Sequence, residues 1–497
     1  MGRFVANLIE VTHHKLLKEG LVDIAINMIN AEQPILPINT PASLDISSFG
    51  GDIFGENTPD PLRFGFRGKL SAHAGGGSHN PIAPDQIQPL AQQILQLTDP
   101  PFNKRCLYVH IPFCRVRCTY CSFFEYASSQ RLIDDYFAAL MVELKYKAAQ
   151  PWTQAAPFQA VYIGGGTPTD LTAAQIKQLG TMIRHHFPLA SDCELTLEGR
   201  INRFSDEMFE SALEGGFNRF SFGVQSFDTQ VRRKAKRLDD RDIVLKRVSE
   251  LAATDQAPIV IDLLYGLPYQ NLDVWQQDLN DFLDSGAHGV DLYQLIEMGN
   301  TPMGKMVEQG RLPEPADTMT KASMFEMGVD YMAKHHLRRL SVNHWARDNR
   351  ERSCYNSLAK TTAEVLPLGA GAGGNVGGYG YMQHRKLERY MDDVNNQRIP
   401  LAMMVKSSPH AAVNTVIKAG FDRGVIVAKQ LDKQAGWSLF SFCMPLFQQW
   451  QQHGFVEIEQ LGHHRYLNLT LAGQFWAVTL AQALIQVITT VTVTAQS

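Results

Sequence analysis

Three cysteines stand close together in the stretch HIPFCRVRCTYCSFFEY, with the spacing C-x3-C-x2-C. They are Cys114, Cys118 and Cys121. Thiolates bind zinc and iron–sulfur clusters, and a fourth thiolate would close either kind of site. Two chemistries therefore fit: a zinc ion completed by His110 or Glu125, or a [4Fe–4S] cluster with one iron left open for a further ligand. An open iron makes a cluster a catalyst or a Lewis acid.

The other four cysteines are scattered singly along the chain: Cys106, Cys193, Cys354 and Cys443. Seven cysteines in 497 residues do not indicate a disulfide framework. Buried free thiols are common and behave as small hydrophobic groups, so that is the default for each of these four. In a reducing compartment, the clustered three indicate metal binding or redox chemistry.

The composition is that of an ordinary globular protein, with 44% hydrophobic and 19% charged residues. A net charge of −4 and a pI near 6.5 give no reason to expect nucleic acid or an anionic membrane as partner. No apolar run is long enough to span a bilayer, and the N-terminus lacks the order of an export signal. We expect a cytoplasmic protein without membrane insertion.

From Cys106 onward, short β-rich runs alternate with amphipathic helical stretches. Six strand–helix units in succession predict a parallel sheet, because parallel strands need crossover connections. Repeated right-handed crossovers curl such a sheet into a partial or complete barrel, and a doubly wound open sheet is the alternative. The cysteines then follow the first strand at its C-terminal end, where active sites of such folds gather. The expected strands are 106–111, 160–165, 193–199, 219–225, 258–266 and 289–297.

The pattern divides the chain into three parts. Residues 1–100 are an irregular, turn-rich N-terminal extension in which only 4–30 look helical. Residues 101–385 form the α/β part. Residues 386–497 form a small, mainly α C-terminal domain, for which a winged-helix arrangement is one option. The glycine run GAGAGG at 369–374 lacks the flanking strand and helix of a dinucleotide fingerprint, and it indicates backbone that approaches a ligand or a neighbouring strand.

An ordered set of motifs carries a resemblance to a known family. YVHIPFC, IGGGTPT, LEGR, FNRFSFGVQSF, DLLYGLPYQ and IEMGNTPMGK resemble radical S-adenosylmethionine (SAM) enzymes, in the branch of the oxygen-independent coproporphyrinogen dehydrogenases and related haem chaperones. The resemblance covers roughly residues 105 to 385. It implies a partial (β/α)6 barrel, a [4Fe–4S] cluster on Cys114, Cys118 and Cys121, and SAM bound through the open iron. The missing fourth cysteine then makes room for SAM.

The same resemblance implies a SAM site at the strand ends. The glycine-rich turn would bond the amino group of SAM, Glu198 a ribose hydroxyl or the ammonium group, and Gln225 and Arg237 would contact the carboxylate region. Each has an ordinary structural alternative: a tight turn for the glycines, structural carboxylates for Glu198 and Asp262, and a solvated basic run, VRRKAKR, for Arg237. The implied SAM-binding residues are Tyr108, Gly165, Gly166, Thr167, Glu198, Gln225, Arg237 and Asp262.

Departures from the branch narrow the resemblance. The coproporphyrinogen dehydrogenases have another cysteine where this chain has Phe123, and the chaperones have an aspartate at Ser122 and a histidine at Tyr355. CTYCSFF, LEGR and RFGFRGKLSAHAGG are similar to the haem-utilisation radical SAM group, methyltransferases of the anaerobilin synthase type. That similarity implies oxygen-independent opening of the haem ring with release of iron, haem as substrate, and a low-potential electron donor such as flavodoxin.

The haem site is harder to place. His344 and Arg347 follow the last clear strand on the expected substrate side, and Tyr355 could ligate haem iron, although packed structural roles are more ordinary for all three. We assign no catalytic residue. The competing hypotheses are a haem chaperone of the same branch, an oxygen-independent porphyrinogen oxidase, which Phe123 weakens, and a zinc protein, which leaves the SAM residue set unexplained.

Overall fold

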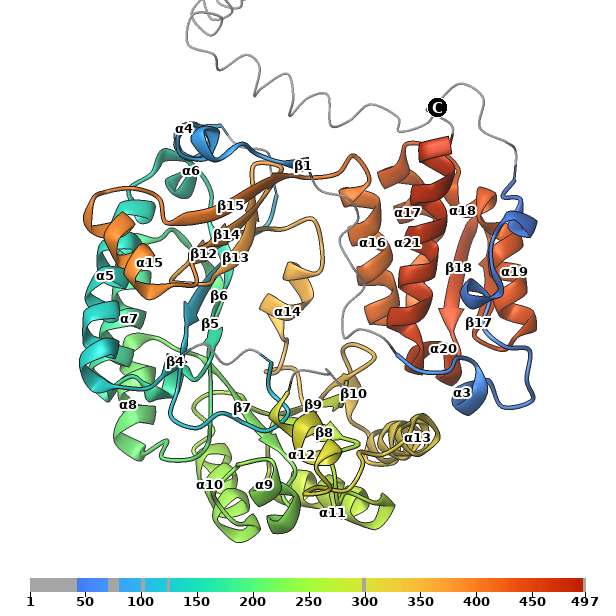
Figure 1. Ribbon diagram of the computed structural model, residues 1–497, viewed down its shortest axis with the longest axis horizontal. Helices are drawn as coiled ribbons and strands as arrows, with labels where there is room; N and C mark the ends of the chain where they lie inside the picture. Colours follow the sequence, from blue (N-terminus) through green and yellow to red (C-terminus); the bar gives the residue numbers. More distant parts are fainter. Residues whose placement is uncertain (1–42, 70–79, 100–102, 123–125, 297–300, 495–497) are drawn as a thin grey trace, which may run out of the picture.

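The computed structural model describes residues 43–69, 80–99, 103–122, 126–296 and 301–494. Its centre is a sheet in which six strands run parallel in the order β2-β5-β6-β7-β8-β9, as the sequence predicts. Figure 1 shows helices along the outer side of this curved sheet, which confirms the partial (β/α)6 barrel. The strands are β2 (Arg105–Ile111), β5 (Phe158–Gly165), β6 (Leu189–Gly199), β7 (Arg219–Gln225), β8 (Ile259–Tyr265) and β9 (Gly289–Gln294).

The two faces of each strand carry different side chains. On β2, Leu107, Val109 and Ile111 belong to the large apolar core beneath the helices, while Tyr108 and His110 alternate onto the barrel interior. Most of the covering helices begin with a side-chain cap, for example the reciprocal bonds between Thr172 and Gln175. The covering helices are α5 (Gln130–Ala148), α7 (Ala173–His186), α8 (Asp206–Gly215), α10 (Arg241–Ala253), α11 (Leu272–Asp284) and α13 (Thr318–Lys334).

The sheet continues beyond the six predicted strands at both edges. A seventh parallel strand, β12 (Glu364–Leu368), pairs with β2, and antiparallel β13 (Gly373–Val376), β14 (Tyr379–Gln383), β15 (Leu401–Lys406) and β1 (Asn80–Pro81) follow. At the opposite edge, β11 (His344–Ala346) pairs antiparallel with β9, and β10 (Arg338–Arg339) pairs with β11. The sheet therefore runs past residue 385, where the sequence places a domain boundary.

Two features hold the extension in place. The glycine run lies in the turn from β12 to β13, with Gly369 and Gly371 at φ of 90° and 82°, and a Cβ on Gly374 would clash with the Val365 carbonyl. Lys147 on α5 donates to the carbonyl of Pro367 at 2.6 Å and to Gln383 at 2.8 Å. This buried ammonium group therefore connects α5 to β12 and β14.

The C-terminal part is mainly helical, as predicted, and carries a small sheet in the order β16-β18-β17. Figure 1 shows it beside the barrel, with the N-terminal segment packed on it. No helix in the described ranges is long and apolar enough to cross a bilayer. The elements are α16 (Ala411–Arg423), β16 (Val425–Val427), α17 (Ala428–Ala435), α18 (Leu439–Phe442), α19 (Met444–Gln452), β17 (Val456–Leu461), β18 (His464–Leu469), α20 (Leu471–Phe475) and α21 (Ala477–Thr494).

The N-terminal segment from residue 43 to 69 is fastened by specific bonds. Trp450 donates its indole N–H to the carbonyl of Ile53 at 2.9 Å, and Trp476 donates to the carbonyl of Leu62 at 3.1 Å. Arg63, on α3 (Pro61–Phe64), pairs with Glu326 on α13 at 2.5 Å. This segment therefore connects the C-terminal helices to the barrel. The helix expected at residues 4–30 lies outside the described residues.

Candidate functional site

The cysteine loop crosses the carboxyl ends of the parallel strands. Cys114 ends the short strand β3 (Phe113–Cys114), and hydrogen bonds hold the loop that follows to the segments after three different strands. Arg115 N–H donates to Asp170 after β5 at 2.9 Å, and Thr119 N–H donates to the carbonyl of Ala235 after β7 at 3.3 Å. The Thr119 carbonyl accepts from Met303 after β9 at 2.7 Å. The loop is thus fixed across the mouth of the barrel.

The surroundings act differently on Cys114 and Cys118, and only those of Cys118 favour the thiolate. Burial raises the pKa of Cys114, although its 3.3 Å hydrogen bond with Thr167 opposes this. Burial would also raise the pKa of Cys118, but the charges of Arg237 and Arg200 outweigh it and leave that pKa below its ordinary value. Arg200 Nη2 donates directly to Cys118 Sγ at 3.2 Å. Because the thiolate is the form that binds metals, the two arginines make Cys118 a suitable ligand of an anionic iron–sulfur group.

The donor set fits a cluster. Within the described ranges, no three His, Cys, Asp or Glu side chains converge as ligands of a single metal ion. The thiolates of a cluster each bind a different iron, so they need not converge in that way. His110, a candidate zinc ligand, shares a 2.9 Å hydrogen bond with Tyr108 through Nδ1, and burial lowers its pKa to about 4. Glu125, the other candidate, lies outside the described residues, as do Phe123 and Phe124.

The glycine-rich turn after β5 packs against the start of the cysteine loop. Gly165 has φ of 118°, and a Cβ there would lie 2.7 Å from the His110 ring. A Cβ on Gly166 would lie 2.5 Å from the Phe113 carbonyl oxygen. The tight-turn interpretation therefore holds in part, since close packing alone requires these glycines. The same turn carries Thr167 to Cys114, so it also shapes the site.

Two half-buried carboxyl groups, Glu198 and Asp262, face the barrel interior below the loop. Burial raises the pKa of Glu198 to about 7, with a hydrogen bond from Tyr162 opposing the shift. Burial, and then the charges of Asp291 and Glu198, raise the pKa of Asp262 to about 8. A carboxyl group with a pKa near neutrality can donate or accept a hydrogen bond, which suits a ribose hydroxyl or an ammonium group.

Gln225 and Arg237 complete the predicted set. Gln225 ends β7 at a register shift and has φ of 75°, a left-handed conformation that is unusual for a residue with a side chain. Arg237 Nη2 donates to Tyr120 Oη at 2.8 Å, within the cysteine loop. Although burial opposes it, Tyr120 and Cys118 hold the pKa of Arg237 above its ordinary value. Both side chains therefore lie at the same strand ends as the thiols.

The predicted haem residues are placed differently. Tyr355, on α14 (Cys354–Ala359), stacks inside the barrel with its ring centroid 4.8 Å from that of Tyr162 and 6.1 Å from that of Tyr108. Burial raises its pKa above the ordinary value, so the phenol stays neutral, which is the poorer form for ligating iron.

Neither His344 nor Arg347 joins the thiols. His344 Nδ1 pairs with Asp291 at 2.8 Å and Nε2 with Glu351 at 3.1 Å, so the ring offers iron no lone pair. Arg347 donates to the carbonyls of Ala287 and Leu283, at 3.1 and 3.0 Å, before β9 begins. That is the end of the barrel opposite the cysteines, because β11 runs antiparallel to β9 and carries the chain back.

Sequence reasoning missed two features of the interior. The first is the contact of Arg200 with Cys118, for which the only signal was the unusual arginine in LEGR. The second is the buried chain from Arg219 through Glu351 to His344, with Arg219 Nε donating to Glu351 at 2.9 Å. A glutamate in a polar loop gives no sequence signal that it will be fully buried.

Comparisons with known proteins agree with this geometry. A sequence model described as Radical SAM superfamily matches residues 108–282. The chain is 36% identical over 411 residues to anaerobilin synthase of Escherichia coli O157:H7, covering 82% of this chain and 89% of that protein. It is 30% identical over 297 residues to the heme chaperone HemW of Bacillus subtilis, covering 59% of this chain and 76% of the chaperone.

One solved structure shares the fold. The coproporphyrinogen III oxidase (HemN) of Escherichia coli, described as a radical SAM enzyme, superposes with a TM-score of 0.70 at 19% identity, covering 84% of this chain and 96% of that one. That likeness shows the fold, and the sequence matches to the superfamily model and to anaerobilin synthase show that the chain belongs to the radical SAM superfamily. Its members use a [4Fe–4S] cluster and SAM, and this chain supplies a thiol loop and strand ends that fit both.

Proposed function

We propose that this protein is a radical SAM methyltransferase that opens the porphyrin ring of haem without oxygen and releases the iron, in the service of haem utilisation and iron acquisition. The observation that carries the proposal is the 36% identity to anaerobilin synthase over 89% of that protein's length. The motifs around the cysteine loop support the same group. Haem would be the substrate, flavodoxin the expected type of electron donor, and the cytoplasm the expected location.

The chain's own residues have clear tasks in this proposal. Cys114, Cys118 and Cys121 would hold the cluster, which together with SAM supplies a carbon-centred radical when both are bound. Arg200 and Arg237 would offset the negative charge of the cluster and its thiolates. Glu198, with a pKa near 7, would hydrogen-bond SAM beneath the loop. The remaining SAM contacts would come from Tyr108, Gly165, Gly166, Thr167, Gln225 and Asp262.

The interior of the barrel would exclude water from the reaction. The stacked rings of Tyr108, Tyr162 and Tyr355 fill the space below the predicted SAM site. A closed floor protects a radical from quenching by solvent and side reactions. Substrate would then enter from the carboxyl ends of the strands, where the cysteine loop lies.

The test is an anaerobic turnover experiment with the reconstituted full-length protein, SAM, haem and a strong reductant. We expect loss of the haem Soret band and a methylated linear tetrapyrrole by mass spectrometry, and neither with Cys118→Ala. The matched control is Cys443→Ala, which removes a buried thiol of the C-terminal part and should leave turnover intact. Unchanged haem, with verified cluster and SAM cleavage, would contradict the proposal.

A haem chaperone is the second candidate, favoured by the 30% identity to HemW over 76% of that protein. It predicts stoichiometric haem binding, no tetrapyrrole product, and transfer of intact haem to an apoprotein. An oxygen-independent porphyrinogen oxidase is a weaker third candidate. Such an enzyme would consume SAM with coproporphyrinogen rather than with haem, so the two substrates offered in parallel distinguish it.

A further inference from the structure

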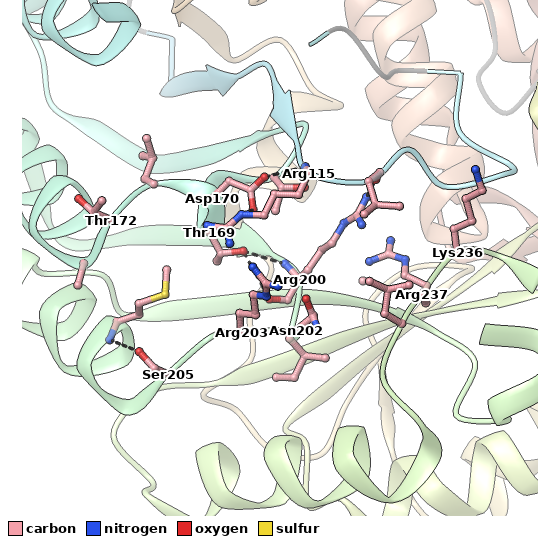
Figure 2. Close-up of a pocket in the computed structure, with 18 of the residues that line it drawn as sticks. Arg115, Thr169, Asp170, Thr172, Arg200, Asn202, Arg203, Ser205, Lys236 and Arg237 are labelled. Carbon is pink, nitrogen blue, oxygen red and sulfur yellow. Dashed lines mark hydrogen bonds and ion pairs between the residues drawn. The ribbon is translucent and has the colours of Figure 1, made fainter. Parts of the chain in front are cut away.

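A pocket of about 330 Å³ lies on one side of the cysteine loop. Figure 2 shows it between Arg115 of that loop, the segment from Thr169 to Thr172 after β5, residues 200–205 after β6, and Lys236 and Arg237 after β7. It shares only Thr167 and Arg237 with the predicted SAM residues. The pocket is thus a feature distinct from most of the SAM site, although one loop borders both.

The lining is strongly basic. Acidic groups are fewer, and one of them, Asp170, is already paired with Arg115 at 3.1 Å. The other is Glu207, at the start of α8. Arg203 and Lys236 are exposed, and neither forms an ion pair with any residue in the described ranges. The basic lining residues are Arg115, Arg200, Arg203, Arg232, Lys236 and Arg237.

The backbone holds two of these cations in strained conformations. Arg203 has φ of 63° and Lys236 has φ of 58°, both in the left-handed region. Such residues cost free energy and persist only where their surroundings impose them, which is common at functional sites. They lie in different segments and face the same pocket (Figure 2). The strained backbone is an observation separate from the number of basic residues, and it also indicates a functional site.

Arg200 connects the pocket to the thiols. Its backbone N–H donates to Thr169 Oγ1 at 3.1 Å, and its Nη2 donates to the carbonyl of Val116 at 2.7 Å and to Cys118 Sγ at 3.2 Å. One side chain therefore lines the pocket and touches a predicted cluster ligand. A group bound in this pocket would come within electron-transfer reach of the cluster.

We propose that this basic face is the docking surface for an acidic one-electron carrier protein that reduces the cluster. Exposed cations lie on separate segments: Arg203, Lys236 and Lys234 of α9 (Thr229–Lys234), together with Arg115 and Arg233, which are paired with Asp170 and Asp240. Cations spread in this way suit an acidic protein surface better than a small anion. The carrier loses one electron and the cluster gains it, with no bond made or broken. The inference deepens the proposed function by locating its electron donor, but it needs only a reducible cluster and not haem as substrate.

The experiment measures cluster reduction by stopped-flow absorbance under anaerobic conditions, with the reconstituted full-length protein and flavodoxin reduced to its hydroquinone as the probe. We expect the cluster of the double variant Arg203→Glu/Lys236→Glu to be reduced about tenfold or more slowly at low salt. The reason is that the variant loses the electrostatic attraction that speeds association with the carrier. High salt should bring wild type and variant together. SAM cleavage without haem serves as a second readout.

Two controls make the result specific. The variant Lys429→Glu/Lys433→Glu makes the same change in net charge on α17 of the C-terminal part, and its cluster should be reduced at the wild-type rate. Dithionite at high salt should reduce every variant equally, with an unchanged electron paramagnetic resonance signal. A wild-type rate for Arg203→Glu/Lys236→Glu with flavodoxin would overturn the proposal. So would equal slowing with dithionite, equal slowing in the α17 control, or a loss confined to haem binding.

Discussion

The two ends of the barrel interior use the same residue types in opposite ways. Towards the amino ends of β7 and β9, Arg219, Glu351, His344 and Asp291 form one buried chain in which every charge has an opposite neighbour. At the carboxyl ends, the exposed Arg203 and Lys236 form no ion pair with any described residue and have a left-handed backbone, and Glu198 has a raised pKa. Paired buried charges stabilise one arrangement of the barrel, whereas unpaired ones are available to bind a ligand.

The largest expected effect comes from the carboxyl end. Cys118→Ala should lose nearly all cluster after reconstitution, because two thiols cannot retain a cluster built on three. Iron and sulfide analysis with the visible absorbance spectrum measures this. Cys193→Ala, which removes a buried thiol of β6, should keep the full iron content. Equal iron content in both variants would contradict the assignment of ligand binding to the carboxyl end of the barrel.

The amino end should show its effect in stability instead. Glu351→Gln leaves Arg219 and His344 without their shared carboxylate, and breaking a buried pair costs about 3–5 kcal/mol of unfolding free energy. Urea unfolding followed by circular dichroism measures the change. Glu207→Gln, an exposed carboxylate at the other end, should change stability by about 0.5 kcal/mol or less. A loss of unfolding free energy below about 0.5 kcal/mol for Glu351→Gln would contradict the structural role proposed for this buried chain of charges.

The buried chain also predicts a pH dependence. Burial alone would lower the pKa of His344, but Asp291 and Glu351 outweigh burial and raise this pKa from 6.5 to about 9. Because this pKa is higher in the folded than in the unfolded protein, protonated His344 stabilises the fold fully below pH 6.5. This contribution to the unfolding free energy, about 3 kcal/mol, is lost as the pH rises through about 9. Asp262, with a pKa raised to about 8, acts in the same direction.

Unfolding free energies measured between pH 6 and about 9.5 test this prediction. Stability should fall across that range in the wild type, and the fall should be clearly smaller in His344→Gln. Lys429→Gln, which changes an exposed side chain on α17, is the control and should keep the wild-type slope. Parallel curves for His344→Gln and the wild type would show that this ring does not carry the charge.

The smallest expected effect concerns Arg200. A charge-assisted hydrogen bond to Cys118 stabilises the more negative, reduced cluster, so Arg200→Gln should make the midpoint potential more negative. A bond worth about 1.5 kcal/mol corresponds to roughly 60 mV for a one-electron couple, which gives the expected order of the shift. Redox titration followed by electron paramagnetic resonance measures it, and Arg200→Lys should restore part of the difference. An unchanged potential would assign Arg200 to docking alone.

The strands and the thiol loop could be predicted because their signals are local. Alternating apolar runs and crossover helices identify six strands, and the C-x3-C-x2-C spacing lies within one loop. The antiparallel strands β13 and β14 escaped prediction because glycine and polar residues interrupt their pattern. The pairing of His344 could not be predicted because its two partners come from β9 and from a loop, and no spacing in the sequence reports such a meeting.

The fastening of the N-terminal segment has a consequence for how the chain folds. Ile53 and Trp450, whose bond joins them, are separated by 397 positions, so the ribosome must finish almost the whole protein before the first described segment finds its place. Contacts of such long sequence separation form late, because the intervening chain must be ordered first. During synthesis the apolar side chains of this segment therefore stay exposed, and the emerging barrel must fold without them.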